Sequence, residues 1–195
     1  MRRIVCLVLL FGGAAFSAAA TELRIQFGAL ERMLTEQAFT QEGRRYVHGS
    51  KATKCNFAYL EKPEVRGEGG LLRMKARFTG RSALNVVGQC VGLGDAFDMV
   101  ITALPLYQNG AIGLQQIRVT SPGKSGYYVR KVCEAMQASL AKGFTYPLSD
   151  ALQHALVDPG MLPGYKREVH KFSVPDVRVT DDALVLHVEF ELTVK

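Results

Sequence analysis

Alternating apolar and polar positions mark two segments of this chain as one-sided β-strands. Between residues 72 and 79, even positions are apolar, and odd positions carry Arg73, Lys75, Arg77 and Thr79. Period-two patterns of this kind predict antiparallel sheets with one buried face and one wet face. The apolar positions are Leu72, Met74, Ala76 and Phe78 in the first segment and Leu184, Leu186, Val188, Phe190, Leu192 and Val194 in the last one.

A β-meander is predicted between these two segments. Residues 97–103 alternate again and stop at Pro105. Asn109 and Gly110 predict a type I′ hairpin, because both residues tolerate a positive φ angle. The return strand, residues 112–119, changes phase midway, which indicates a β-bulge. Three glycines in the preceding β-rich stretch are interpreted as bends or bulges: Gly88, Gly92 and Gly94.

Helical spacing appears in three places. Residues 29–39 carry apolar side chains at helical intervals, and a further helix begins near Pro147. The longest predicted helix covers residues 125–142. Its apolar face is Val129, Val132, Cys133, Met136 and Leu140. The order of elements predicts an α+β fold in which a curved antiparallel sheet covers helices on one face.

The first twenty residues predict a cleavable secretory signal peptide. Arg2 and Arg3 precede a short apolar run, and small residues end in an Ala-x-Ala pattern before Thr21. The apolar run is much shorter than the roughly 20 residues that span a bilayer. We therefore expect residues 1–20 to be removed. Residues 21–195 would then form a single periplasmic or secreted domain.

An oxidising compartment favours a disulfide among the three remaining cysteines. Cys55 and Cys90 are the preferred pair, because both lie in strand-like segments, although three pairings are open. Cys133 lies on the apolar helix face, where a cysteine packs as a small hydrophobic side chain.

Sequence motifs for catalysis, metal binding and phosphate binding are absent, so we expect no enzyme, no metal and no cofactor. The four histidines are isolated, and Asp181 and Asp182 are typical turn residues. A hydrolase stays open as the third hypothesis, since a Ser-His-Asp triad is assembled in space.

The charge balance is modestly basic. The formal net charge of +6 falls to +4 when Arg2 and Arg3 leave with the signal peptide. This excess permits transient contact with an anionic membrane surface. Basic residues are dispersed and tryptophan is absent, which argues against nucleic acid as a partner.

Abundant one-sided apolar surface admits two interpretations. An ordinary packed core is the one that periodicity alone favours. The other is a tubular cavity for a lipid or another apolar small molecule. Its predicted lining is Leu72, Met74, Phe78, Phe97, Met99, Ile101, Leu114, Val129, Val132, Met136, Leu140, Leu184, Leu186, Val188 and Phe190.

One segment, residues 103–119, carries a family resemblance. Its strand, Ala-Leu-Pro, hairpin and Gly-Ala-Ile-x-Leu pattern resembles the YceB-like bacterial envelope lipoproteins, which are similar to tubular lipid-binding (TULIP-type) domains. The resemblance implies a highly curved antiparallel sheet wrapped around a long α-helix, with a short N-terminal helix and a terminal β-hairpin. This chain departs from the family in lacking a lipobox cysteine and in having Cys55 and Cys90.

The leading functional hypothesis is an exported periplasmic protein that binds or carries a lipid or another hydrophobic ligand. The alternative is a non-catalytic envelope module with a fully packed core, which acts through a protein-binding edge or loop.

Overall fold

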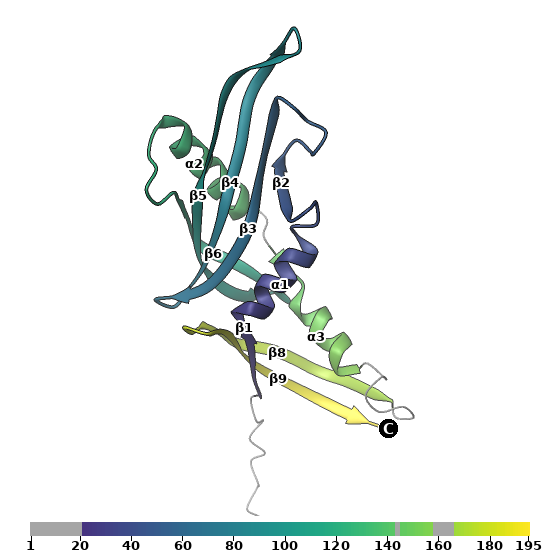
Figure 1. Ribbon diagram of the computed structural model, residues 1–195. Helices are drawn as coiled ribbons and strands as arrows, with labels where there is room; N and C mark the ends of the chain where they lie inside the picture. The colour runs from purple at the N-terminus through teal and green to yellow at the C-terminus, as the bar shows by residue number, and fades with distance from the viewer. Residues whose placement is uncertain (1–20, 143–144, 158–165) are drawn as a thin grey trace, which may run out of the picture.

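The structure is a computed structural model that describes residues 21–142, 145–157 and 166–195. It is mostly β, with 60% strand and 20% helix, arranged as two antiparallel sheets with three short helices (Figure 1). The predicted signal peptide, residues 1–20, lies outside the described residues. No described helix is both long and apolar enough to cross a membrane.

The larger sheet has six strands in sequence order and is curled. Its three longest strands follow each other through tight hairpins, as their alternating sequences predict. The strands are β2 (Arg44–His48), β3 (Asn56–Glu68), β4 (Leu71–Val86), β5 (Gln89–Gln108), β6 (Ala111–Thr120) and β7 (Thr145–Tyr146).

The smaller sheet contains three strands in the order β1-β9-β8. Its central strand is the regular C-terminal segment, which pairs with both neighbours. Asp181 and Asp182 lie in the turn between the two C-terminal strands, where Thr180 Oγ1 donates to Asp182 Oδ1 at 2.8 Å. The strands are β1 (Thr21–Gln26), β8 (Arg167–Val179) and β9 (Ala183–Val194).

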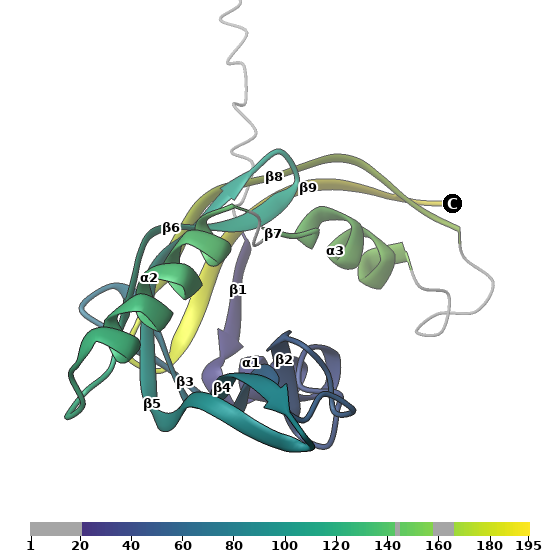
Figure 2. The same cartoon turned by 90° about the horizontal axis from the view of Figure 1, so that it is seen from above.

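The three helices cover different parts of the sheets. Figure 2 shows them spaced around the molecule instead of gathered in one layer. The first helix contacts β3, the second contacts β6 and the third contacts β8. They are α1 (Phe27–Gln37), α2 (Tyr127–Ala141) and α3 (Leu148–Val157).

The expectation of a curved sheet wrapped around a long α-helix is wrong. The predicted helix at residues 125–142 is present as α2, but it has only 15 residues, about 22 Å. Only one side of α2 is apolar, whereas Arg130, Lys131 and Glu134 are exposed on the other. A helix with a single apolar stripe can be covered on one face only, so no sheet surrounds it. The described chain is a mostly β fold and not the predicted α+β arrangement.

Two apolar clusters form the core. The first joins the core-facing side of β4 and β5 to α2 and includes Phe78 and Met99, which are 2% and 0% exposed. The second joins β9 to β1, β8 and α3, with Leu186 fully buried. Helix α1 links them, because Leu34 packs on the first cluster and Leu30 on the second.

Two turns show how local sequence relates to the sheet. The Asn109-Gly110 hairpin is confirmed, with φ angles of 51° and 80°. Gly88 is a turn residue, whereas Gly92 and Gly94 lie in the regular part of β5 and not at bulges. The regular pairing of β4 with β5 therefore continues through Gly94 and Gly92, where bends were expected, as far as the turn at Gly88.

Candidate functional site

The predicted ligand-lining residues are divided between the two clusters. Those from β5 and α2 pack together with Met74 and Phe78 of β4 in the first cluster. Phe78 and Phe97 are in direct ring contact, with centroids 4.9 Å apart. The buried members are Phe78, Phe97, Met99, Ile101, Val129 and Met136, and the partly buried members are Met74, Val132 and Leu140.

The remaining predicted lining residues lie elsewhere. Leu184, Leu186 and Val188 are buried in the second cluster, against which Leu72 packs. Leu114 is half-buried on β6, and Phe190 is 36% exposed near the end of β9. Leu72 of β4 thus packs with the β9 residues, whereas Phe78 of β4 packs with α2, and the predicted lining residues do not surround one common helix.

The Cys55–Cys90 disulfide is present and fits an exported protein. It links residues 35 apart in sequence, with a Cα–Cα distance of 5.2 Å. Cys133 is a buried free cysteine, and burial raises the pKa of its thiol. The disulfide ties the start of β3 to the start of β5, close to the β4–β5 turn.

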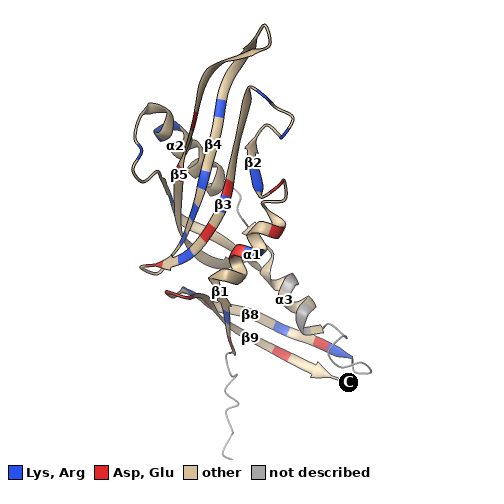
Figure 3. Ribbon diagram, in the orientation of Figure 1, with Lys and Arg blue, Asp and Glu red and all other residues tan. Residues whose placement is uncertain are grey.

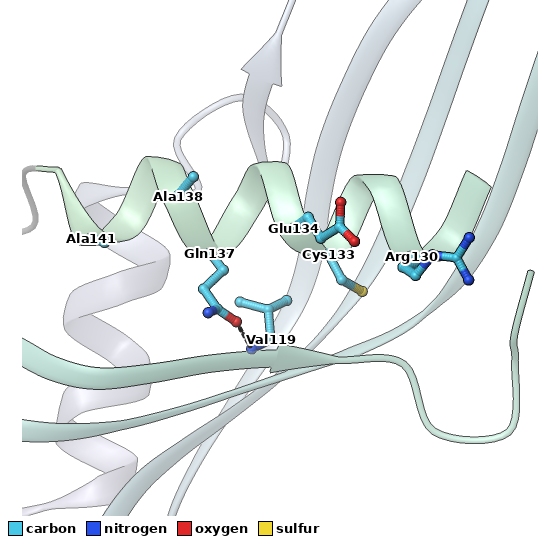
Figure 4. Close-up of a pocket in the computed structure, with 7 residues that line it drawn as sticks. All are labelled: Val119, Arg130, Cys133, Glu134, Gln137, Ala138 and Ala141. Carbon is cyan, nitrogen blue, oxygen red and sulfur yellow. Dashed lines mark hydrogen bonds between the residues drawn. The ribbon is translucent and has the colours of Figure 1, made fainter. Parts of the chain in front are cut away.

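An open groove of about 350 Å³ runs along α2 (Figure 4). Gln137 crosses it, and its Oε1 accepts a hydrogen bond from the Val119 backbone N–H at 3.2 Å. This contact occupies a backbone group of β6 that no strand partner covers, since β7 pairs only with Ile112 and Gly113. The groove is lined by Val119, Arg130, Cys133, Glu134, Gln137, Ala138 and Ala141.

A second surface lies at the far end of β4 and β5. We call residues 82–93 the β4–β5 arm; its strands pair from Ser82↔Leu93 to Val86↔Gln89. Figure 1 shows this hairpin projecting beyond α1 and α2. Five large aliphatic side chains on it are exposed: Leu84 at 76%, Val86 at 51%, Val87 at 99%, Val91 at 60% and Leu93 at 67%.

Four of these side chains continue the core-facing side of the sheet. Leu84 and Val86 share their face of β4 with Phe78, and Val91 and Leu93 share theirs of β5 with Phe97. Near the foot of the arm, Tyr128 of α2 approaches Gly80, and its hydroxyl lies 3.1 Å from the position that a Cβ would take there. Beyond that point, helix coverage ends while the apolar pattern continues.

The turn of the arm has an unusual residue. Val87 has a φ angle of 49° and Gly88 one of 82°. The Gly88 backbone N–H donates to Asn85 Oδ1 at 2.9 Å and fixes the turn. A β-branched residue rarely adopts a positive φ, because its side chain crowds the backbone.

Charge is distributed around the arm but not on it. No charged residue lies between Arg81 and Asp95, and Figure 3 shows the outer hairpin free of either sign. Lys124 pairs with Asp95 at the foot of the arm and lowers the pKa of that carboxyl. Arg81, at the foot, and Lys54, next to the disulfide-bonded Cys55, have no ion-pair partner among the described residues.

Several titratable side chains elsewhere form pairs. His187, which the sequence placed on a wet strand face, is only 26% exposed, and its Nδ1 lies 3.0 Å from Asp176 Oδ2. Glu168 is held by Lys195 and Lys166, which lower the pKa of its carboxyl to about 2. In the described part of the chain, no three His, Cys, Asp or Glu side chains are placed to hold a metal ion.

The sequence reasoning missed the arm as a candidate site. Its signal was available, because the even-numbered apolar positions of β4 continue through Leu84 and Val86. Comparison with known proteins finds no matching family model, no matching curated protein and no matching solved structure. The YceB-like resemblance therefore stays a prediction, and the geometry carries the functional argument.

Proposed function

We propose that this chain is an exported, non-catalytic protein that binds a lipid or another hydrophobic ligand on the apolar face of its β4–β5 arm. The observation that carries the proposal is the uncovered continuation of the core-facing side of β4 and β5. The disulfide supports export, and the Ala-x-Ala pattern before Thr21 supports a periplasmic or secreted location.

Binding of a ligand to this face would remove a substantial apolar surface from contact with water. Each large aliphatic side chain contributes about 1.5–3 kcal/mol when it passes from full exposure to full burial. Leu84, Val91 and Leu93 are each at least 60% exposed and lie on one face, so an acyl chain can contact all three. Such a contiguous exposed patch is typical of a binding surface and not of an ordinary protein exterior.

Native mass spectrometry of delipidated residues 21–195, titrated with a long-chain fatty acid, tests this proposal. We expect a fatty-acid adduct whose affinity falls at least tenfold in the Leu84→Asp/Leu93→Asp variant. Val47→Asp is the matched control, because Val47 is also exposed, at 45%, but lies on β2. A clean apo mass at all fatty-acid concentrations would contradict the proposal.

The second candidate is an interaction module that pairs with a strand of another protein. It is favoured by the outer edge of β5, which has no strand partner before Val100 in the described part of the chain. Lys124 Nζ donates to the Ala96 carbonyl at 3.3 Å and occupies part of that edge. Residues 89–94 are left as a template for strand addition.

Hydrogen exchange distinguishes this second candidate from ligand binding. Strand addition predicts that the backbone amides of residues 89–94 are protected in envelope extract relative to purified protein. The amides of the β5–β6 turn at Asn109 and Gly110 serve as the internal reference. Equal exchange in extract and in buffer would argue against strand addition.

A further inference from the structure

We propose that the end of the β4–β5 arm docks onto anionic phospholipid bilayers, with Val87 and its aliphatic neighbours entering the interface. This inference rests on the proposed function and deepens it, because it identifies the apolar ligand as the surface of a membrane. Its evidence is the composition, the conformation, the charge pattern and the tethering of the arm.

The outermost part of the arm has the composition of a membrane-contacting loop. Val87 is 99% exposed, and Val86 and Leu84 extend the aliphatic surface behind it. No charged side chain lies between Arg81 and Asp95, so entry of the tip into the interface would desolvate no ion.

The conformation of Val87 points in the same direction. A two-residue turn with positive φ at both positions favours Asn or Gly first, and the same chain uses Gly69 and Asn109 first in its two other described turns of this kind. Val87 makes the β4–β5 turn harder to form. In return, valine places an aliphatic side chain at the most exposed point of the hairpin, which asparagine or glycine would not do.

Charge complementarity selects a bilayer with anionic headgroups. Lys51 near the foot of the arm is paired with Glu42, and Lys124 is paired with Asp95. Lys54 and Arg81 have no ion-pair partner within the described residues. Arg81 pairs with Gly94 across the two strands, one residue pair below the arm. With the tip in the apolar interface, Lys54 lies close behind it, because it is next to the Cys55–Cys90 bond beside the turn. Arg81 lies about 20 Å from the turn at the rise of an extended strand, and it adds to the attraction of the arm to a negatively charged surface.

The arm is also held in place. Cys90 follows the turn by two residues and is bonded to Cys55, next to Lys54. Asn85 fixes the turn from within through the Gly88 backbone N–H. The tethered hairpin holds its aliphatic tip and the two unpaired cations in a constant arrangement, and its two strands form backbone hydrogen bonds with each other. Shallow entry leaves the unpaired outer edges at headgroup depth, where water is present.

Vesicle co-sedimentation of disulfide-bonded residues 21–195 tests the docking. Phosphatidylglycerol–phosphatidylcholine vesicles are compared with pure phosphatidylcholine vesicles. We expect at least tenfold tighter binding to the anionic vesicles. Val87→Asp should reduce that binding at least tenfold, whereas Val47→Asp should leave it unchanged. Lys54→Gln/Arg81→Gln should remove the preference for anionic vesicles and the dependence on salt.

Each outcome has a definite meaning. Equal binding by the Val87→Asp variant would overturn the docking, and so would equal affinity for both vesicle types. Absence of vesicle binding together with concentration-dependent dimers in analytical ultracentrifugation would assign the arm to a second copy of this chain. Uptake of free fatty acid without vesicle binding would overturn the docking and leave the proposed function intact. Absence of both fatty-acid uptake and vesicle binding would overturn the docking and the proposed function together.

Discussion

Two hairpins of the six-stranded sheet, β4–β5 and β5–β6, have nearly the same turn backbone and different surroundings. The first residue of each turn has a φ angle near 50°, and the second is a glycine with a φ angle near 80°. The Asn109-Gly110 turn is packed, since the Gly110 carbonyl accepts a hydrogen bond from the Ser149 backbone N–H at 2.9 Å. The Val87-Gly88 turn projects into solvent. Backbone geometry explains Asn109 but not Val87, which is the residue that the proposed membrane docking uses.

The largest expected effect concerns the tether that only one hairpin possesses. Replacement of both Cys55 and Cys90 by serine should lower the free energy of unfolding by about 3–4 kcal/mol, because the disulfide closes a long loop in the unfolded chain. Urea unfolding monitored by circular dichroism measures the loss. Cys133→Ala is the control, since it removes a thiol without removing a cross-link. A change below about 1 kcal/mol in the double variant would indicate that the tether matters little to folding.

Exchange of the turn residues should act in opposite directions at the two hairpins. Asn109→Val places a β-branched side chain at a positive φ angle and should destabilise the fold by about 1–2 kcal/mol. Thermal unfolding of the variant beside Asn109→Gly, which accepts that φ angle freely, checks the effect. Equal melting temperatures for the Val and Gly variants would show that the turn tolerates either residue.

The reverse exchange, Val87→Asn, should raise the free energy of unfolding by about 1 kcal/mol, because asparagine adopts the left-handed region more readily. Val87 makes no packing contribution that could offset the gain, since it is 99% exposed. Calorimetric melting measures the shift, and Val47→Asn supplies the matched surface exchange. A more stable protein that no longer sediments with anionic vesicles would separate folding from docking at one position.

The smallest effect concerns pH at the foot of the arm. The hydrogen bond from Lys124 is the main cause that lowers the pKa of Asp95 below its ordinary value of 3.8, and the Ala96 backbone N–H adds to it. The stabilisation is present above pH 3.8 and is lost as pH falls through the lowered pKa. Urea midpoints of the wild type and Asp95→Asn should therefore converge in acid. If the urea midpoints of the two proteins differ by the same amount at every pH, the Lys124–Asp95 pair does not contribute to stability.

Local chemistry was sufficient for part of the fold. Asn109 and Gly110 predict their hairpin from turn preference alone, and the strand-like settings of Cys55 and Cys90 lead to the disulfide that is observed. The helix at residues 125–142 is displaced by no more than two residues at its start and one at its end. These features depend on neighbours in sequence or on a small set of possible pairings.

The extent of helix coverage depends on tertiary packing. Phe78 and Leu84 have the same position in the alternating pattern, yet one is 2% exposed and the other 76%. Periodicity identifies which face of a strand is apolar, whereas burial of that face depends on how far along β4 the first turn of α2 reaches. The exposed turn was missed for another reason: valine is a poor turn former, so Val87-Gly88 lacks the composition of a hairpin.

Burial of Cys133 has a consequence for thiol–disulfide exchange. Burial raises the pKa of its thiol and so disfavours the thiolate, which is the form that attacks a disulfide. In the folded protein, packing of Cys133 between α2 and the sheet therefore also reduces its reactivity toward the Cys55–Cys90 bond.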